Sequence, residues 1–269
     1  MTLIRPPAVV IALAALAAAS VIFPLVSVLV SIPWGESMDL LTTQESLEAL
    51  WLSLRTSAMS AVVCLLLGLP LAVLLTRTNW PGRSVLRAAV LVPLVLPPVV
   101  SGIALLMAFG RLGLLGPLLD SLDMRVVFTT SAVIIAQIFV SIPFTVLTLE
   151  SALRTLGTRP ETVASQLGAG PTRVLVTITL PRLAPALITG LVLAFARSLG
   201  EFGATLTFAG SMPGVTRTLP LEIYRVREMS PEYASVLSVL LIVVALLVVL
   251  LAYARPFRSG KGAPKEPAR

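Results

Sequence analysis

The sequence lacks histidine altogether and contains a single cysteine, Cys64, in 269 residues. A disulfide framework needs pairs of cysteines, and zinc, haem and imidazole-relay sites normally use histidine. We therefore expect no disulfide, no resident metal and no cofactor in this chain. Charged side chains are also scarce, because they make up 12% of the residues, whereas an ordinary soluble domain carries about 25%.

Apolar side chains are abundant instead: they make up 57% of the residues, and the mean hydropathy is +0.98. Too few polar groups are present to cover a soluble globule, so most of the exterior is expected to face lipid. The net charge is +7, but the basic residues are spread over short segments between apolar runs. That distribution favours anionic lipid over nucleic acid as the partner. The composition therefore predicts a multi-pass protein of the cell membrane.

The intervals between charged residues locate the membrane spans. An ionised side chain at the bilayer centre costs roughly 2.5 to 3.5 kcal/mol, and a span needs about 20 residues. Five charge-free intervals are long enough, namely residues 6–35, 56–76, 88–110, 126–149 and 233–254. A sixth apolar stretch, residues 183–216, is interrupted only by Arg197 and Glu201. We therefore predict an all-α membrane protein with six transmembrane helices.

The first interval also admits a second interpretation, as a signal peptide with Arg5 in its positive region. Its apolar run continues through Ile32, whereas the apolar region of a signal peptide has about 7 to 15 residues. A transmembrane helix is therefore the favoured interpretation.

The distribution of Lys and Arg predicts the orientation. With a cytoplasmic N-terminus, the inside segments hold 13 of these residues, the outside segments hold 6, and Arg197 is the remaining one of the 20. The positive-inside rule then places both termini in the cytoplasm.

We divide the chain into an N-terminal helix with its outside loop (1–46), a core of five transmembrane helices (47–254) and a Pro-, Gly- and Lys-rich tail expected to be disordered (255–269).

Two connections between the spans are unusual. The inside connection, residues 150–182, is predicted to contain a short helix at 159–167, with Pro160 in its first turn and Gly168 where it stops. The outside connection, residues 210–232, is predicted to contain an interfacial helix near 219–228. Its last residues, Ser230, Pro231 and Glu232, are typical of the start of a helix.

The inside connection carries a recognisable motif. From Thr162 the chain reads TVASQLGAGPTRVLVTITLP. It resembles the signature of binding-protein-dependent ABC importer permeases, which is E-A-A, three residues, Gly, nine residues, Ile, one residue and Leu-Pro. Gly168, Ile178, Leu180 and Pro181 stand at the matching positions. The sequence departs from the signature at its front, where the three opening positions are Thr162, Val163 and Ala164, and Glu161 lies one place early. Any role that needs a carboxylate at the first position is therefore in question.

This resemblance implies a MetI-like permease fold and a coupling helix at about 158–171 that docks in a cleft of a cytoplasmic ATPase dimer. A short amphipathic helix that ends at a glycine is also suited, by itself, to lie in a groove of another protein. The chain contains no G-x-x-x-x-G-K-[ST] phosphate-binding loop. We therefore expect a transport subunit rather than an enzyme, with ATP hydrolysis on a separate subunit. The implied coupling residues are Glu161, Thr162, Val163, Ala164, Gly168, Ala169, Ile178, Leu180 and Pro181.

A second resemblance concerns residues 197–220, which contain RSLGEFGAT, AGSMPG and TRTLP. Sulfate and molybdate permeases share the L-G-E-[FY]-G core, and the G-x-T-R-T-[IL]-P continuation is similar to the molybdate members. The resemblance implies a molybdate importer permease that works as a homodimer by alternating access, supplied by an extracytoplasmic molybdate-binding protein. Tungstate, sulfate and thiosulfate stay open as substrates. An ion-coupled secondary transporter and a membrane-embedded enzyme are the competing classes.

The same stretch supplies candidate residues of the translocation pathway. Arg197 and Glu201 are four residues apart and can pair on one face of a helix, and in a membrane they must face the protein interior, an interface or a watery cavity. They either offer a transient positive charge to a dianion or form a structural ion pair. The structural pair is favoured, because a carboxylate repels an oxyanion. Further candidates, which can contact an oxyanion or serve helix packing, are Gly200, Gly203, Thr205 and Thr207.

Overall fold

The computed structural model describes residues 7–32, 34–35 and 37–253, and this part of the chain is helical without any strand. The tail 255–269, predicted to be disordered, lies outside the described residues. The α-helices are α1 (Ala8–Val30), α2 (Ser37–Leu41), α3 (Gln44–Arg77), α4 (Arg83–Leu91), α5 (Pro98–Phe109), α6 (Gly116–Ser121), α7 (Thr130–Leu156), α8 (Arg159–Gln166), α9 (Pro171–Val174), α10 (Leu180–Leu199), α11 (Gly203–Ala209), α12 (Leu219–Arg227) and α13 (Pro231–Tyr253). A 3₁₀ turn, η1 (Val92–Leu94), follows α4, and a π-helical turn, η2 (Leu175–Thr179), precedes α10.

Among the described residues, five helical stretches are long and apolar enough to cross a membrane: α1, α3, α7, α13 and the continuous stretch Pro171–Leu199. A sixth is present if the bent pair of α4 with η1 and α5 counts as one span. The prediction of an all-α, multi-span membrane protein is therefore confirmed.

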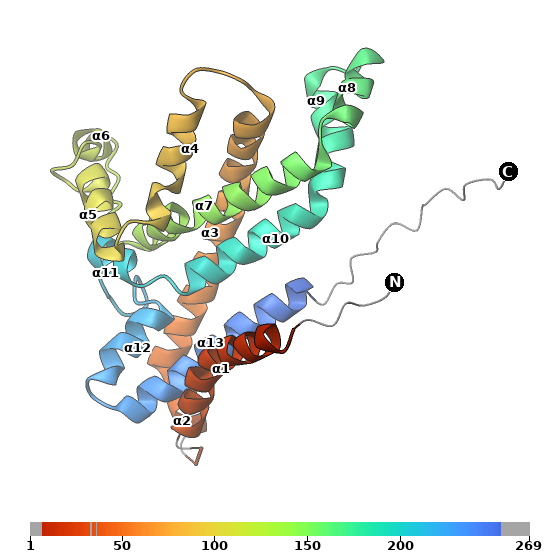
Figure 1. Ribbon diagram of the computed structural model, residues 1–269. Helices are drawn as coiled ribbons and strands as arrows, with labels where there is room; N and C mark the ends of the chain where they lie inside the picture. The colour runs from red at the N-terminus through yellow and green to blue at the C-terminus, as the bar shows by residue number, and fades with distance from the viewer. Residues whose placement is uncertain (1–6, 33, 36, 254–269) are drawn as a thin grey trace.

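The third predicted span, residues 88–110, is not one continuous helix. The axis turns by 118° between the stretch Arg83–Leu94 and α5, and Figure 1 shows α5 leaving the direction of α4. The break coincides with Pro97 and Pro98, the N-cap and first residue of α5. Proline has no N–H to donate, and its ring clashes with the carbonyl oxygen of the preceding helical turn. Two consecutive prolines therefore end a helix.

The sixth predicted span, residues 183–216, is also displaced. Its helix begins at Pro171, runs through η2 without interruption and ends at Leu199. Gly200, Glu201 and Phe202 are not helical, and the short α11 follows them. The local reason is that Gly200 terminates the helix, which charge counting in the sequence does not detect.

The core lies among α3, α7 and α10, which cross in the middle of the molecule (Figure 1). Leu149 and Leu153 of α7 pack against Ala72 of α3 and Leu183 of α10. A second core cluster joins α5, α7 and α11. A third joins the start of α3 to α12 and α13. These clusters hold the three central helices and the two short helices α5 and α11 in fixed relation.

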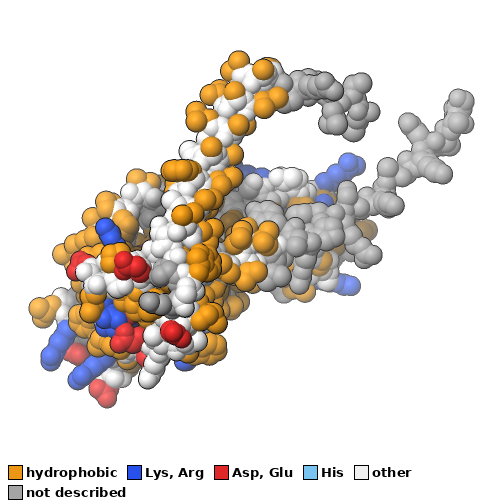
Figure 2. All heavy atoms as spheres, turned by 90° about the horizontal axis from the view of Figure 1, so that it is seen from below, with side chains coloured by type: hydrophobic (Ala, Val, Ile, Leu, Met, Phe, Trp, Pro, Cys, Tyr) orange, Lys and Arg blue, Asp and Glu red, His pale blue; other side chains and the backbone are white. Residues whose placement is uncertain are grey.

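The outside of the chain is strongly apolar. The first helix, α1, has no buried residue, and large hydrophobic side chains are exposed along α1, α3, α5 and α13. Figure 2 shows hydrophobic side chains over much of the face that it presents, while the acidic side chains gather at the lower left together with several basic ones, and further basic side chains stand at the right. A surface of this kind is stable only against lipid or another apolar surface.

Candidate coupling and pathway sites

The first candidate site is α8, the short helix within the connection 150–182. Pro160 stands in its first turn, and Gly168 follows its end with a φ of +87°, a backbone conformation that favours glycine. The N–H of Ala169 donates to the carbonyl of Ala164 at 3.0 Å and closes the helix end. The helix therefore occupies eight of the residues 158–171, and α9 begins at Pro171.

One face of α8 points away from the protein. Val163 is 48% exposed and Leu167, next to the helix end, is 83% exposed. The two are four residues apart, so they lie on one side of the helix. Thr162, Ser165 and Gln166 are also exposed. This face offers two apolar side chains to a groove on another molecule.

The opposite side of α8 faces the rest of the chain through Glu161. Its carboxylate lies between Arg77, the last residue of α3, and Thr179, the last residue of η2. Thr179 is buried, Ile178 and Leu180 are partly buried beside it, and Pro181 is exposed in the first turn of α10. On α8, Thr162 and Val163 are thus exposed, whereas Glu161 faces the chain and reaches the end of η2, where Ile178 and Leu180 are partly buried.

A second candidate site surrounds Arg197 and Glu201. Their side chains form an ion pair at 2.7 Å, and Arg197 is 31% exposed whereas Glu201 is 2% exposed. The pairing is as predicted, but the shared helix is not, because α10 ends before Glu201. The Oε1 atom of Glu201 also accepts a hydrogen bond from the N–H of Ala204 at 3.0 Å, so the carboxylate caps the positive end of α11.

The other predicted pathway residues lie on or beside α11. Gly203 packs against Pro98 of α5, and the hydroxyl of Thr207 donates to the carbonyl of Gly203 at 3.0 Å. The N–H of Gly200 donates to the carbonyl of Ala196 at the end of α10. Thr205 is fully buried, and its hydroxyl has no hydrogen-bond partner in the described part of the chain. Gly203 and Thr207 thus lie at the contact between α5 and α11, whereas Gly200 ends α10 and Thr205 is buried within α11.

Comparison with known proteins decides the family. The family model described as "Binding-protein-dependent transport system inner membrane component" matches residues 64–257. The chain belongs to this family. It is accordingly a multi-pass inner membrane protein, and α8 with its motif lies within the matched residues.

Two curated relatives of this inner membrane component are informative. The molybdenum transport system permease protein ModB of Mycobacterium tuberculosis is 55% identical over 237 residues, which are 87% of this chain and 89% of the relative. The sulfate transport system permease protein CysW of Synechococcus elongatus is 36% identical over 217 residues, 80% of this chain and 75% of the relative. The chain is thus more similar to that molybdenum permease than to that sulfate permease.

Two solved structures share the fold. A bacterial alginate ABC transporter, in complex with its pentasaccharide-bound periplasmic protein, has a chain that superimposes with a TM-score of 0.71 at 18% identity, covering 93% of this chain and 96% of that one. The MetNI methionine ABC transporter, in an inward-facing conformation, gives a TM-score of 0.61 at 19% identity, with coverages of 77% and 92%. The predicted MetI-like permease fold is therefore confirmed. At these identities the likeness concerns the fold alone.

The chain also contains a buried polar cluster that the sequence analysis did not predict. Gln137 of α7 donates to Thr56 of α3 and to the carbonyl of Ser198 of α10, both at 3.2 Å. Ser60 donates to Gln137 at 2.9 Å, and Ser141 bonds to Ser198. All of these side chains are buried. The signal was present in the sequence, since Ser53, Thr56, Ser57 and Ser60 recur every three or four residues along α3, as small polar residues at helix interfaces do.

Another missed cluster fixes the connection before α12. Glu222 is fully buried and pairs with Arg225 at 2.6 Å and with Arg217 at 3.6 Å. Arg225 also reaches Glu45 at the start of α3. The hydrogen bonds that Arg225 donates to the Glu222 carboxylate raise the pKa of Arg225 above its ordinary value, so this guanidinium stays charged. The cluster ties the loop 210–218 and α12 to α3, far from α8 (Figure 1).

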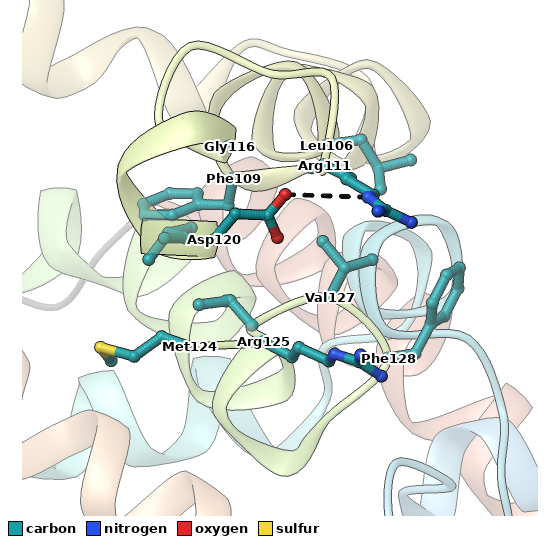
Figure 3. A pocket seen from close by; sticks show the side chains of 12 residues that line it. Leu106, Phe109, Arg111, Gly116, Asp120, Met124, Arg125, Val127 and Phe128 are labelled. Carbon is teal, nitrogen blue, oxygen red and sulfur yellow. Dashed lines mark ion pairs between the residues drawn. The ribbon is translucent and has the colours of Figure 1, made fainter. Parts of the chain in front are cut away.

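A pocket of about 420 Å³ opens between α5, α6 and the segment that precedes α7. Figure 3 shows Arg111 and Asp120 facing one another across it, at 3.7 Å, with Arg125 and Phe128 on the α7 side. Both members of this ion pair are largely exposed, so their attraction is weak. None of the predicted site residues lines the pocket.

Proposed function

We propose that this chain is the membrane-spanning subunit of an ATP-driven ABC importer for molybdate. The observation that carries the proposal is α8, a helix that projects from the bundle, presents Val163 and Leu167 outward and carries the permease motif. The 55% identity to a molybdenum permease supports the substrate. Tungstate is close to molybdate in size and charge, so it is expected to be carried as well. A less similar relative is a sulfate permease, so sulfate is the alternative that a test must separate.

The energy comes from a partner. The sequence contains no phosphate-binding loop of the G-x-x-x-x-G-K-[ST] type, so ATP is hydrolysed on a separate cytoplasmic ATPase dimer. The apolar face of α8 docks in a groove of that partner, as amphipathic helices do. The implied orientation places α8 and both termini in the cytoplasm, in agreement with 13 Lys and Arg residues inside and 6 outside.

The substrate path runs between two copies of the chain. A homodimer with a two-fold axis provides a closed interface in which each copy supplies half of the path, and the exposed apolar side chains of α3 and α5 need a cover of lipid or protein. An extracytoplasmic molybdate-binding protein delivers the ion on the α12 side. ATP-driven motion of α8 then turns the spans, and the ion leaves toward the cytoplasm by alternating access.

Glu201 and Arg197 form a structural ion pair beside this path and do not bind the ion. The carboxylate is committed to Arg197 and to the N-terminus of α11, and its negative charge repels a dianion. The pair thereby fixes α11 in its close contact with α5. Weak contacts along the path are sufficient, because selectivity then resides in the capture protein.

The proposal is tested with the chain purified together with its ATPase and reconstituted in lipid. We expect the binding protein loaded with molybdate or tungstate to stimulate ATP hydrolysis and ATP-dependent uptake, and the sulfate-loaded protein to do so much less. Stimulation by sulfate alone would assign the chain to sulfate. Uptake into vesicles without ATP, driven by an ion gradient, would overturn the proposal in favour of a secondary transporter.

A further inference from the structure

The helix α8 is held to the rest of the chain mainly by one junction. None of its residues is buried, and glycines stand at both of its ends, namely Gly157, Gly168 and Gly170. Gly157 has a φ of +64° and Gly168 one of +87°, and a Cβ added at any of the three would meet nothing within 4 Å. The connections on either side therefore lack packing that would resist rotation.

Arg77 supplies the junction from α3. Its Nη2 atom donates to the carbonyls of Leu153 and Gly157 at 3.0 Å each, and to Oε1 of Glu161 at 3.1 Å. Its Nε atom lies 2.8 Å from Oε2 of Glu161. The carbonyl of Leu153 is one of those left without a partner at the end of α7. One guanidinium thus joins the ends of α3 and α7 to the first turn of α8.

Thr179 extends the junction to α10. Its hydroxyl donates to Oε1 of Glu161 at 2.9 Å, and it is the last residue of the π-helical turn that leads into α10. Both Arg77 and Glu161 are mostly buried, so water competes little for these bonds. Single π-helical turns within α-helices commonly occur at functional sites, and here the turn lies where α10 receives its contact from α8.

We propose that Glu161 is a positioning residue that makes α8 move as one body with the cytoplasmic ends of α3 and α10. A displacement of α8 by the ATPase then reaches two spans directly through the Arg77–Glu161–Thr179 junction, instead of being lost in rotation at the flanking glycines. The carboxylate faces this chain, whereas Val163 and Leu167 face the partner. The inference rests on the proposed function and adds to it which residue transmits the motion.

The functional test compares substitutions in the assembled complex of permease, ATPase and binding protein in proteoliposomes. We expect Glu161→Gln to leave ATP hydrolysis within about twofold of the unmodified complex and to lower oxyanion uptake per ATP at least fivefold. Arg77→Met should have the same effect, and the double substitution should lower uptake no further, because both changes break one junction. Additive losses would overturn the proposal, since they would mean that Glu161 acts through another partner.

A matched control lies at the same end of the molecule. Arg87 of α4 pairs with Glu150 of α7 at 2.8 Å and also donates to the carbonyl of Leu75, and in the described part of the chain neither side chain forms a hydrogen bond or ion pair with α8. Glu150→Gln should lower thermal stability and leave uptake per ATP unchanged. An equal loss of uptake per ATP in Glu150→Gln would assign the effect of Glu161→Gln to general loosening and would overturn the proposal.

A second measurement is independent of transport. Cys64 is the single cysteine, so spin labels can be placed at Ser165 on α8 and Ser151 on α7, both exposed, in a Cys64→Ala background. We expect a narrow distance distribution in the unmodified complex and a broadened one in Glu161→Gln. An unchanged distribution would overturn the junction. If no oxyanion stimulates ATP hydrolysis but the distance distribution still broadens in Glu161→Gln, the proposed function is refuted and the junction is supported.

Discussion

Gly203 of α11 lies directly against Pro98 of α5. A Cβ built on Gly203 would stand 2.5 Å from the Cβ of Pro98, closer than real Cβ atoms approach. The contact is repeated one turn away, where a Cβ on Gly102 would stand 2.5 Å from the Cβ of Thr207. The bent segment after Pro97 and the short helix after Glu201 therefore meet through one glycine each.

Gly203→Ala is expected to push α11 away from α5. The neighbour is a proline ring that cannot rotate aside, so overpacking should cost about 1–3 kcal/mol of stability and lower uptake by the reconstituted complex. Thermal unfolding in lipid or detergent and uptake assays measure the two effects. Gly35→Ala is the control, because nothing lies within 4 Å of a Cβ there. A Gly203→Ala chain as stable and active as the control would contradict the close contact.

Removing either partner of the Arg197–Glu201 pair is expected to have unequal effects. Arg197→Ala leaves a carboxylate buried without its counter-charge, which costs about 3–5 kcal/mol when a buried pair is broken. Glu201→Gln should cost less, because the partly exposed guanidinium can turn to water. Thermal unfolding of the two variants compares these costs.

The double substitution Arg197→Ala with Glu201→Gln separates structure from transport. It removes both charges, so it should recover part of the stability that Arg197→Ala loses, and the folded complex should still take up molybdate. A double variant that folds as well as the unmodified chain but transports nothing would show that the charged pair takes part in transport and is not only structural.

Gln137→Ala is expected to loosen the centre of the bundle. Thr56 of α3 and the carbonyl of Ser198 of α10 would lose the amide that donates to them, whereas Ser60 keeps its bond to the carbonyl of Ile134; a buried polar group that loses its partner costs about 1–3 kcal/mol. Thermal unfolding measures the loss, with Gln44→Ala as the control, because Gln44 is exposed at the start of α3. Equal unfolding temperatures for the two variants would mean that the polar cluster adds no stability.

Leu167→Asp is expected to release the ATPase without unfolding the permease. The side chain is exposed on the outward face of α8, so a charge there costs little in the free chain but opposes docking in an apolar groove. Co-purification should show at least tenfold weaker association. Leu112→Asp is the matched control, since Leu112 is fully exposed in the segment after α5. Retention of the ATPase by Leu167→Asp would exclude this face as the docking surface.

The sequence by itself determined the membrane-spanning helices and the position of α8. Desolvation of charge acts residue by residue, so the charge-free intervals reveal the spans, and Pro160 and Gly168 mark the ends of α8 because capping is a local property of the backbone. The signature that follows Thr162 also sufficed to indicate the family. The ends of the spans were less well determined, since Gly200 and the pair Pro97–Pro98 interrupt helices inside apolar intervals.

Only the tertiary structure decided which polar groups meet. Arg77 and Glu161 are 84 residues apart in sequence, and Gln137 bonds to groups 81 residues before it and 61 after it. Whether a buried charge or amide is tolerated depends on a partner brought there by the packing of α3, α7 and α10. No pattern along one segment encodes that meeting, because the free energy of a buried polar group is set by its neighbours in space rather than by its neighbours in the chain.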